Sequence, residues 1–273
     1  MEQFALGESL LSAQSRSRWQ DKLLLHVIWL TSDESNSPVP VKFHKCLNSW
    51  PQLNSELCCV LWLDKDARAL VESLDKVEFF YRKLLTPVER ADWIRMRILH
   101  VFGGIYVDVD MQSLLPVVPV LQKSNKSVAL LQSSLFSESF QSCIIVARSP
   151  GIELFEQVAL QIEENVNKFP EGNCGNSIRA VLAIPFVRQA ARSFLTVWLT
   201  GPANIDRVLA RSAISGEYVG KIQILDHTFY NGPLARHHEA GSWTHFGTAT
   251  VMIDAIKSLT FRQTLRMLIP KIW

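Results

Sequence analysis

The most informative segment of the sequence is Phe102-Gly103-Gly104-Ile105-Tyr106-Val107-Asp108-Val109-Asp110, which joins a helix end, a sharp turn, a strand and two carboxylates. Two consecutive glycines let the backbone turn abruptly, since glycine adopts conformations that other residues avoid. Residues 105–107 are apolar or aromatic and predict a short strand. Because Asp108 and Asp110 follow at once, the sequence places two carboxylates at the carboxyl end of a strand.

The helix before this turn has a strong start signal. Thr86-Pro87-Val88-Glu89 combines a Thr cap, Pro at the first helical position and Glu three residues after the cap. We expect the helix to run to about Phe102, where the glycines end it. Asp92 and Arg95 lie three residues apart, and an exposed ion pair is their simplest interpretation. The positions expected to face the core recur at helical spacing: Ala91, Ile94, Ile98 and Val101.

Strands and helices alternate on both sides of this segment. The run Leu23–Leu30 is almost continuously apolar and ends in a polar cluster, as a buried parallel strand does. This alternation predicts a single α/β domain over residues 1–273 with a helical tail at 248–273. The expected strands are 23–30, 56–62, 127–131, 142–147 and 221–225, and the expected helices are 41–50, one opening at 66–71, 150–166 and one after 200–202.

The composition excludes several classes of protein. The chain has 273 residues, of which 48% are hydrophobic, so a disordered chain is excluded. Its 28 Lys and Arg and 26 Asp and Glu are scattered and give a net charge of +2, which argues against a nucleic-acid-binding protein. The five cysteines include no C-x-x-C pair, so a zinc knuckle or a thioredoxin-like site is not supported.

Targeting signals are not recognised in the sequence. Residues 1–20 lack the features of a signal peptide, and the apolar run Leu23–Leu30 is too short to span a bilayer. We therefore expect a cytoplasmic protein, or a Golgi or membrane-associated one if an N-terminal anchor was removed. The basic, amphipathic tail 261–273 suits peripheral contact with an anionic membrane or a core-packing terminal helix.

The Asp-x-Asp pair at 108 and 110 poses an electrostatic problem. In an extended chain both carboxylates point the same way, and their like charges repel unless water, a basic partner or a metal ion offsets them. Carboxylates suit Mg²⁺ or Mn²⁺, which keep open positions for phosphate oxygens. Tyr106 shares this face by strand alternation. For an isolated Asp-x-Asp, a solvated acidic turn is the alternative.

A longer pattern connects these features. Residues 91–95, Leu99 and 102–110 resemble the DXD signature of glycosyltransferase family 32, whose distant relatives include the catalytic domains of large clostridial glucosylating toxins. Weaker matches to other motifs of the same family occur in the same order as in the family, over about residues 23–243. They are the opening strand ending in His26-Val27-Ile28-Trp29, the second strand at Trp62-Leu63-Asp64, the T-G-P turn at 200–202 and an H-x-x-x-G-S-W motif at 237–243.

The resemblance implies a GT-A fold, a Rossmann-like sheet that binds a nucleotide sugar at the carboxyl ends of its strands. It implies a divalent ion, Mn²⁺ or Mg²⁺, held by Asp108, Asp110 and His237, with Ser242 or Glu239 as the alternative to His237. The two aspartates are the implied catalytic residues. The implied donor-binding residues are Trp29, which would stack on the base, and Asp92, Arg95, Tyr106, Ser242 and Trp243.

The implied activity is retaining transfer of a hexose from a nucleotide sugar, with UDP-hexose favoured by Trp29 and the toxin-like spacing. A mannosyltransferase that uses GDP-mannose is the alternative within the family. The acceptor, whether glycan, lipid or protein, is not readable from the sequence. Gln141-Ser142-Cys143 departs from the family, which often has Asn there, so the contact made by this segment is open.

Two alternatives belong to other classes. A phosphatase of the haloacid-dehalogenase type also uses Asp-x-Asp after a strand. Its pair normally lies on the first strand and continues with Thr or Val, whereas here Met111 follows. A non-catalytic carbohydrate-binding protein or a decayed transferase would not need the intact aspartate pair together with Asp92 and Arg95.

Overall fold

The computed structural model describes residues 4–11, 22–74, 77–133, 139–168, 196–218 and 220–238. The chain divides into two compact units, one of Met1–Asn173 with Thr196–Glu239 and one of Cys174–Leu195 with Ala240–Trp273. All described residues belong to the first unit. The single domain over 1–273 and the helical tail at 248–273 therefore stay predictions, and the tail lies outside the described residues.

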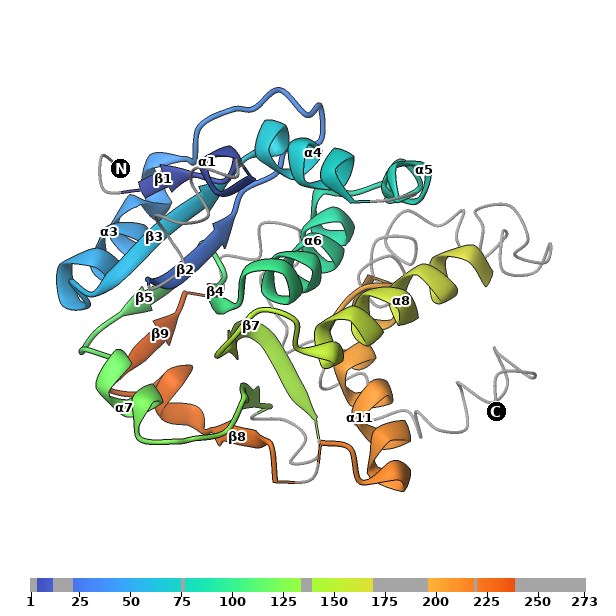
Figure 1. Cartoon of the computed structure of the whole chain (residues 1–273). Coiled ribbons are helices and arrows are strands. Elements are labelled where there is room, and N and C mark those ends of the chain that lie inside the picture. The colour runs from blue at the N-terminus through green and yellow to red at the C-terminus, as the bar shows by residue number, and fades with distance from the viewer. Residues whose placement is uncertain are drawn as a thin grey trace, which may run out of the picture. The chain divides into compact units, whose positions relative to one another are not determined.

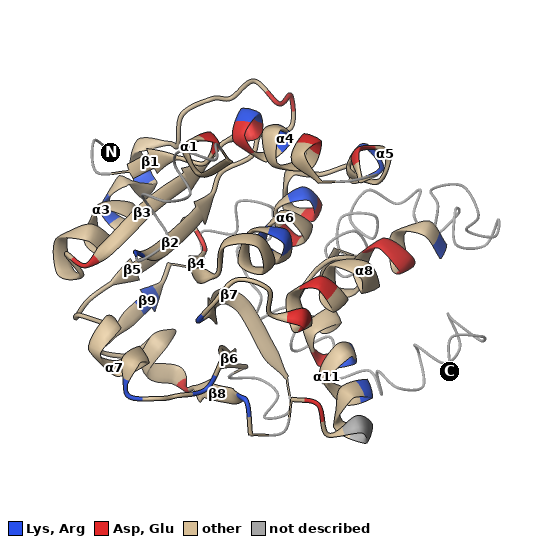
Figure 2. Cartoon of the chain, viewed as in Figure 1, with Lys and Arg blue, Asp and Glu red and all other residues tan. Residues whose placement is uncertain are grey.

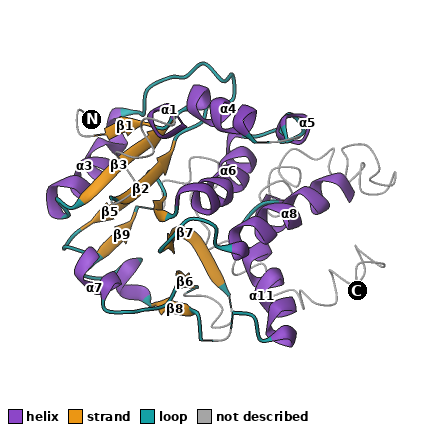
Figure 3. Cartoon of the chain, in the orientation of Figure 1, coloured by secondary structure: helices purple, strands orange, loops and turns teal. Residues whose placement is uncertain are grey.

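The first unit is built on a seven-stranded sheet with the order β1-β3-β2-β4-β7-β6-β8 (Figure 3). The strands β1, β3, β2 and β4 run parallel to one another, β7 is antiparallel to both of its neighbours, and β8 is parallel to β6. A second, two-stranded sheet pairs β5 with β9. The bounds are β1 Phe4–Leu6, β2 Leu23–Ile28, β3 Leu57–Trp62, β4 Gly104–Val107, β5 Met111–Ser113, β6 Val128–Gln132, β7 Phe140–Ala147, β8 Ile222–Leu225 and β9 Ala235–His237.

Helices connect and cover these strands (Figure 1). They are α1 Glu8–Leu11, α3 His44–Leu53, α4 Asp64–Ser73, α5 Glu78–Tyr81, α6 Pro87–Phe102, α7 Val118–Gln122, α8 Glu153–Lys168 and α11 Ala203–Ser215, with 3-10 turns at η1 Val41–Phe43 and η2 His227–Phe229. The predicted α/β fold and its principal elements are confirmed. The sequence missed the short elements β1, α1, α5, β5, α7 and β9, whose three to five residues carry too little periodicity. Among the described helices, none is both long and apolar enough to span a membrane.

The predicted start and end of α6 are both confirmed. The Thr86 hydroxyl accepts a hydrogen bond from the Glu89 N–H at 3.2 Å, and the Glu89 carboxylate accepts one from the Thr86 N–H at 3.1 Å. At the other end Gly103 has φ +66° and Gly104 has φ +95°. A Cβ atom on Gly104 would lie 2.6 Å from the Leu24 carbonyl oxygen, so β4 can meet β2 only through a glycine.

The hydrophobic core is drawn from the sheet and from α4, α6, α8 and α11. Ile94 and Ile98 of α6 are fully buried, as predicted, while Ala91 and Val101 are half-buried. Trp62 and Trp93 are also fully buried, so these two tryptophans are core residues. Burial of large apolar side chains, at about 1.5–3 kcal/mol each, holds α6 against the sheet.

His26 ties the centre of the sheet to the Gly-Gly turn. It is fully buried on β2, its Nε2 lies 2.9 Å from the Gly103 carbonyl oxygen, and the Trp62 indole N–H donates to its Nδ1 at 3.2 Å. Because Nδ1 accepts, Nε2 carries the proton and donates to Gly103. Burial lowers the pKa of His26 to about 4, with the Gly103 hydrogen bond acting in the opposite direction.

Because His26 is buried in its neutral form, we expect the folded state to lose stability in acid. Below pH 6.5 the unfolded chain protonates His26, whereas the folded chain resists protonation down to about pH 4. The unfolded state then binds more protons, so stability falls as the pH falls through this window, by roughly 3 kcal/mol in all. Urea unfolding of wild type and His26→Gln from pH 7 to pH 4 measures it. The wild type should lose more stability than the variant; parallel pH profiles would contradict the assignment.

Candidate functional site

The two aspartates of the Asp-x-Asp pair lie in the turn that joins β4 to β5. The Asp108 N–H donates to the Cys143 carbonyl at 2.9 Å, and the Met111 N–H donates to the Asp108 carbonyl at 3.0 Å. The backbone here is a turn and not the extended chain that the spacing predicted. The carboxylates nevertheless converge, because each offers an oxygen within 4.8 Å of the other and of a His237 nitrogen.

His237 reaches this pair through the small sheet. Strand β9 lies antiparallel to β5, with His237 opposite Met111. Its Nε2 is 3.3 Å from Asp110 Oδ1 and 4.0 Å from Asp108 Oδ2. The Tyr230 ring stacks on the imidazole with centroids 5.0 Å apart, which fixes the ring orientation. The three residues that the family resemblance implied as metal ligands therefore do come together.

The neighbouring histidine has another role. The His238 N–H donates to the Asp110 carbonyl at 3.0 Å, and His238 Nε2 lies 2.9 Å from Gln112 Oε1. These contacts hold β9 against the aspartate turn. The alternative ligand Glu239, and the donor-site candidates Ser242 and Trp243, lie outside the described residues, so their roles stay predictions.

Strand β5 is anchored from the other side by α3. The Trp50 indole N–H donates to the Met111 carbonyl at 2.8 Å, and the Ser49 hydroxyl accepts from the Ser113 N–H at 2.9 Å. The Asn54 side chain donates to the Ser113 hydroxyl at 3.2 Å and accepts from the Val117 N–H at 2.7 Å. Local sequence patterns carry no signal for these supports, because their partners lie far away in the chain.

Arg95 of α6 is the cation of the site. Its guanidinium lies 2.7 Å from Asp92 Oδ1 and 3.3 Å from Asp108 Oδ1, and it donates to the Ser142 carbonyl at 2.9 Å. Asp92 and Arg95 are each 5% exposed, so the simple interpretation of an exposed ion pair is wrong. Burial raises the pKa of Asp92 to about 6, while Arg95 and a hydrogen bond from Thr200 act in the opposite direction.

Tyr106 shares its face with Asp108, as strand alternation predicted. Its hydroxyl donates to Asp108 Oδ1 at 2.7 Å, and the Arg95 guanidinium carbon lies 4.6 Å from the ring centroid. Tyr106 is only 2% exposed. One oxygen of Asp108 is therefore occupied by Tyr106 and Arg95, and the other faces His237.

The segment that departs from the family contributes through its backbone. The Ser142 carbonyl accepts from Arg95, and the Cys143 carbonyl accepts from the Asp108 N–H, so the backbone of β7 helps to position both residues. Trp29 lies just after β2, with its ring 5.6 Å from that of Phe43. Its indole nitrogen is buried and has no hydrogen-bond partner among the described residues.

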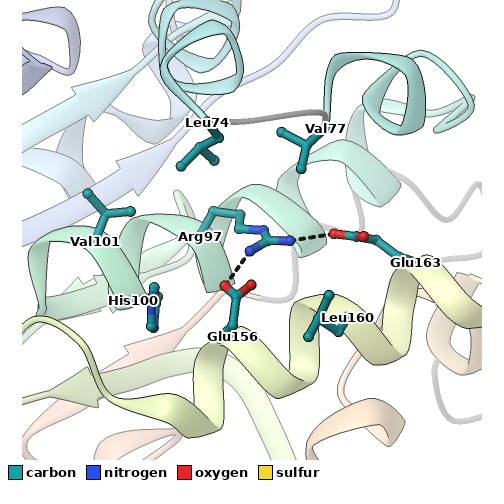
Figure 4. A pocket seen from close by; sticks show the side chains of 8 residues that line it. All are labelled: Leu74, Val77, Arg97, His100, Val101, Glu156, Leu160 and Glu163. Atoms are coloured by element: carbon teal, nitrogen blue, oxygen red, sulfur yellow. Dashed lines mark hydrogen bonds and ion pairs between the residues drawn. The ribbon is translucent and has the colours of Figure 1, made fainter.

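A pocket of about 470 Å³ lies elsewhere, between α6 and α8 (Figure 4). Arg97 projects into it and forms ion pairs with Glu156 and Glu163 of α8. Both carboxylates are therefore already paired with a cation. Acidic and basic residues also occur together on α4, α6 and α11 (Figure 2), so charge alone does not distinguish this pocket. The pocket thus holds the ion pairs that join two core helices, and the aspartate cluster is the stronger candidate site.

Comparisons with known proteins agree with this geometry. Residues 40–127, about a third of the chain, match the family model described as "Glycosyltransferase sugar-binding region containing DXD motif". The ligand-free glycosyltransferase domain of the YGT toxin is similar at 9% identity and a TM-score of 0.51, covering 78% of this chain and 82% of that one. A comparison with curated protein sequences finds no significant match.

Two further solved structures are similar at lower scores. The UDP-bound form of the YGT toxin domain has 11% identity and a TM-score of 0.47, covering 75% of this chain and 79% of that one. The catalytic domain of alpha-toxin from Clostridium novyi has 10% identity and a TM-score of 0.48, covering 91% and 82%.

The expected resemblance to DXD glycosyltransferases and the GT-A fold are thereby confirmed. The family model and the fold together indicate a glycosyltransferase, with a candidate divalent-metal site at Asp108, Asp110 and His237. Membership of family 32 itself stays a prediction.

The three-residue cluster predicts metal binding that depends on each ligand. We expect Mn²⁺ to bind the wild type and Asp110→Asn or His237→Ala to bind it roughly tenfold more weakly or worse, because the first replaces a charged carboxylate with a neutral amide and the second removes the imidazole nitrogen. Titration followed by electron paramagnetic resonance measures the affinity. Glu156→Gln, in the separate pocket, is the control and should bind like the wild type. Equal affinity in all four proteins would contradict the site.

Proposed function

We propose that this chain is a retaining, metal-dependent glycosyltransferase that moves a hexose from a UDP-hexose to a glycan, lipid or protein acceptor. The observation that carries the proposal is the convergence of Asp108, Asp110 and His237, with the buried Arg95 guanidinium beside them. Two acidic side chains, an imidazole and a fixed cation suit a site that receives a diphosphate through a divalent ion.

Asp108, Asp110 and His237 would hold Mn²⁺ or Mg²⁺. When bound, such an ion would offset the negative charge that grows on the departing nucleoside diphosphate. The donor set fits, because carboxylate oxygens suit both ions and imidazole is a common ligand of first-row metals. Tyr106 serves this site by holding Asp108 Oδ1, which leaves Oδ2 toward the cluster.

The remaining residues would bind and orient the donor. Arg95 carries a positive charge into a largely buried position, where its effect on a developing anion is stronger than in water. Asp92 and Arg95 would bind hydroxyls of the sugar or the ribose. Trp29 would stack on the base. Ser242 and Trp243 are further candidates for donor binding, on the family resemblance alone.

The choice of UDP rests on Trp29 and on the toxin-like spacing of the motifs. The YGT toxin domain, whose ligand-free form has the same fold, has also been solved with UDP bound, and this fact about that domain is consistent with our choice. The family resemblance implies that the anomeric configuration of the transferred sugar is retained. The carboxylate of Asp92 is already bonded to Arg95 and Thr200, so we assign it no nucleophilic role.

Donor hydrolysis tests the proposed activity. With Mn²⁺ present, the wild type should release UDP from at least one UDP-hexose, and EDTA or Asp110→Ala should abolish the release because the diphosphate charge is then uncompensated. The assay compares UDP-glucose, UDP-galactose and GDP-mannose by nucleoside diphosphate release, with Glu156→Gln as an active control. Full turnover in EDTA, or an active Asp110→Ala protein, would contradict the mechanism. A clear preference for GDP-mannose would overturn only the choice of UDP.

A further inference from the structure

The T-G-P turn at Thr200-Gly201-Pro202 has a defined conformation. The N–H groups of Thr200 and Gly201 both donate to the Thr196 carbonyl, at 3.0 and 2.9 Å. A Cβ atom on Gly201 would lie 2.8 Å from the Cα of Val197, so only glycine permits this close approach. Pro202 then precedes α11. The glycine and the proline determine the backbone conformation of the turn. They do not account for the threonine side chain.

Two buried amides fix this turn to the helices around it. Asn204 donates to the Gly201 carbonyl at 3.0 Å and to the Leu199 carbonyl at 3.1 Å. Its Oδ1 accepts from Asn165 of α8 at 2.7 Å. Both side chains are buried, with Asn204 completely so. The turn therefore presents Thr200 from a rigid support.

The Thr200 hydroxyl lies against the site's buried carboxylate. Thr200 is 1% exposed, and its Oγ1 is 2.9 Å from Asp92 Oδ2 and 3.1 Å from the Thr196 carbonyl oxygen. A hydroxyl donates one proton, and an ionised carboxylate is the stronger acceptor, so the proton goes to Asp92. The other Asp92 oxygen accepts from Arg95 at 2.7 Å.

We propose that Thr200 is a positioning residue, whose hydroxyl fixes Asp92 so that Asp92 holds the Arg95 guanidinium beside Asp108. The inference rests on the proposed function, because it assigns Arg95 to the donor. Without the hydroxyl, one oxygen of a buried carboxylate loses its partner, and the carboxylate gains by rotating or by taking a proton. Either change loosens Arg95, which would then meet the donor in several orientations.

Three variants distinguish a positioning role of Thr200 from a role in protein stability alone. Thr200→Val keeps the shape and removes the hydroxyl, whereas Thr200→Ser keeps the hydroxyl. Thr86→Val is the matched control, since it removes a threonine hydroxyl from the N-terminus of α6, the helix that carries Asp92 and Arg95. A merely structural role predicts that activity follows thermal stability in all three proteins.

We expect Thr200→Val to lower kcat for donor hydrolysis about ten- to a hundredfold, because it loses a hydrogen bond to a charged group. Its affinity for UDP with Mn²⁺ should stay within about twofold of wild type, since Trp29 and the three metal ligands, which would hold UDP, are unchanged. Thr200→Ser should recover most of kcat, and Thr86→Val should lose thermal stability but keep its kcat. Thr200→Ala, assayed at low temperature, replaces Thr200→Val if that protein does not fold.

Crystal structures of wild type and Thr200→Val give a second result that does not depend on activity. The variant should show Arg95 displaced from Asp108. An unmoved guanidinium, a fully active Thr200→Val, or a Thr200→Ser as impaired as the valine variant would each overturn the proposal. If the wild type turns over no donor, the proposed function fails, and the crystal comparison still decides whether Thr200 positions Arg95.

Discussion

The placement of the Arg95 guanidinium between Asp92 and Asp108 is the interaction on which the site depends. Asp92 and Asp108 both contact Arg95, and Asp110 lies beside Asp108. Asp92 and Asp110 are buried, and Asp108 is partly exposed. Like charges at such short range repel strongly in a low-dielectric interior, so a fixed cation is required. Removal of one partner from a buried ion pair costs about 3–5 kcal/mol, because the other charge is left uncompensated.

The surrounding fold keeps the components of this arrangement in place. The Gly-Gly turn brings β4 back beside β2 directly after α6, so Arg95 of the helix meets Asp108 of the strand end. Helix α3 fixes β5 after the aspartates, and β9 brings His237 to them. The burial of Trp62, Trp93 and the apolar face of α6 supplies the stability that offsets a cluster of buried charges.

Much of the fold and part of the site could be predicted from local sequence. The capping box and the paired glycines fixed the limits of α6, and the apolar runs located β2 and β3, because these signals act over a few residues. The Asp-x-Asp pair identified two members of the site. The same methods missed β5 and β9 and left an exposed ion pair open as one interpretation of Asp92 and Arg95, since three-residue strands and burial depend on distant partners.

Local sequence patterns establish an α/β protein with two aspartates at the end of a strand, a helix carrying Asp92 and Arg95, and a T-G-P turn. The folded chain adds that His237 lies beside Asp110, that Tyr106 and Arg95 share one oxygen of Asp108, and that Thr200 contacts Asp92. This difference arises because capping, glycine turns and periodicity are local properties. A hydrogen bond between residues far apart in the chain exists only after the core has packed and brought them together.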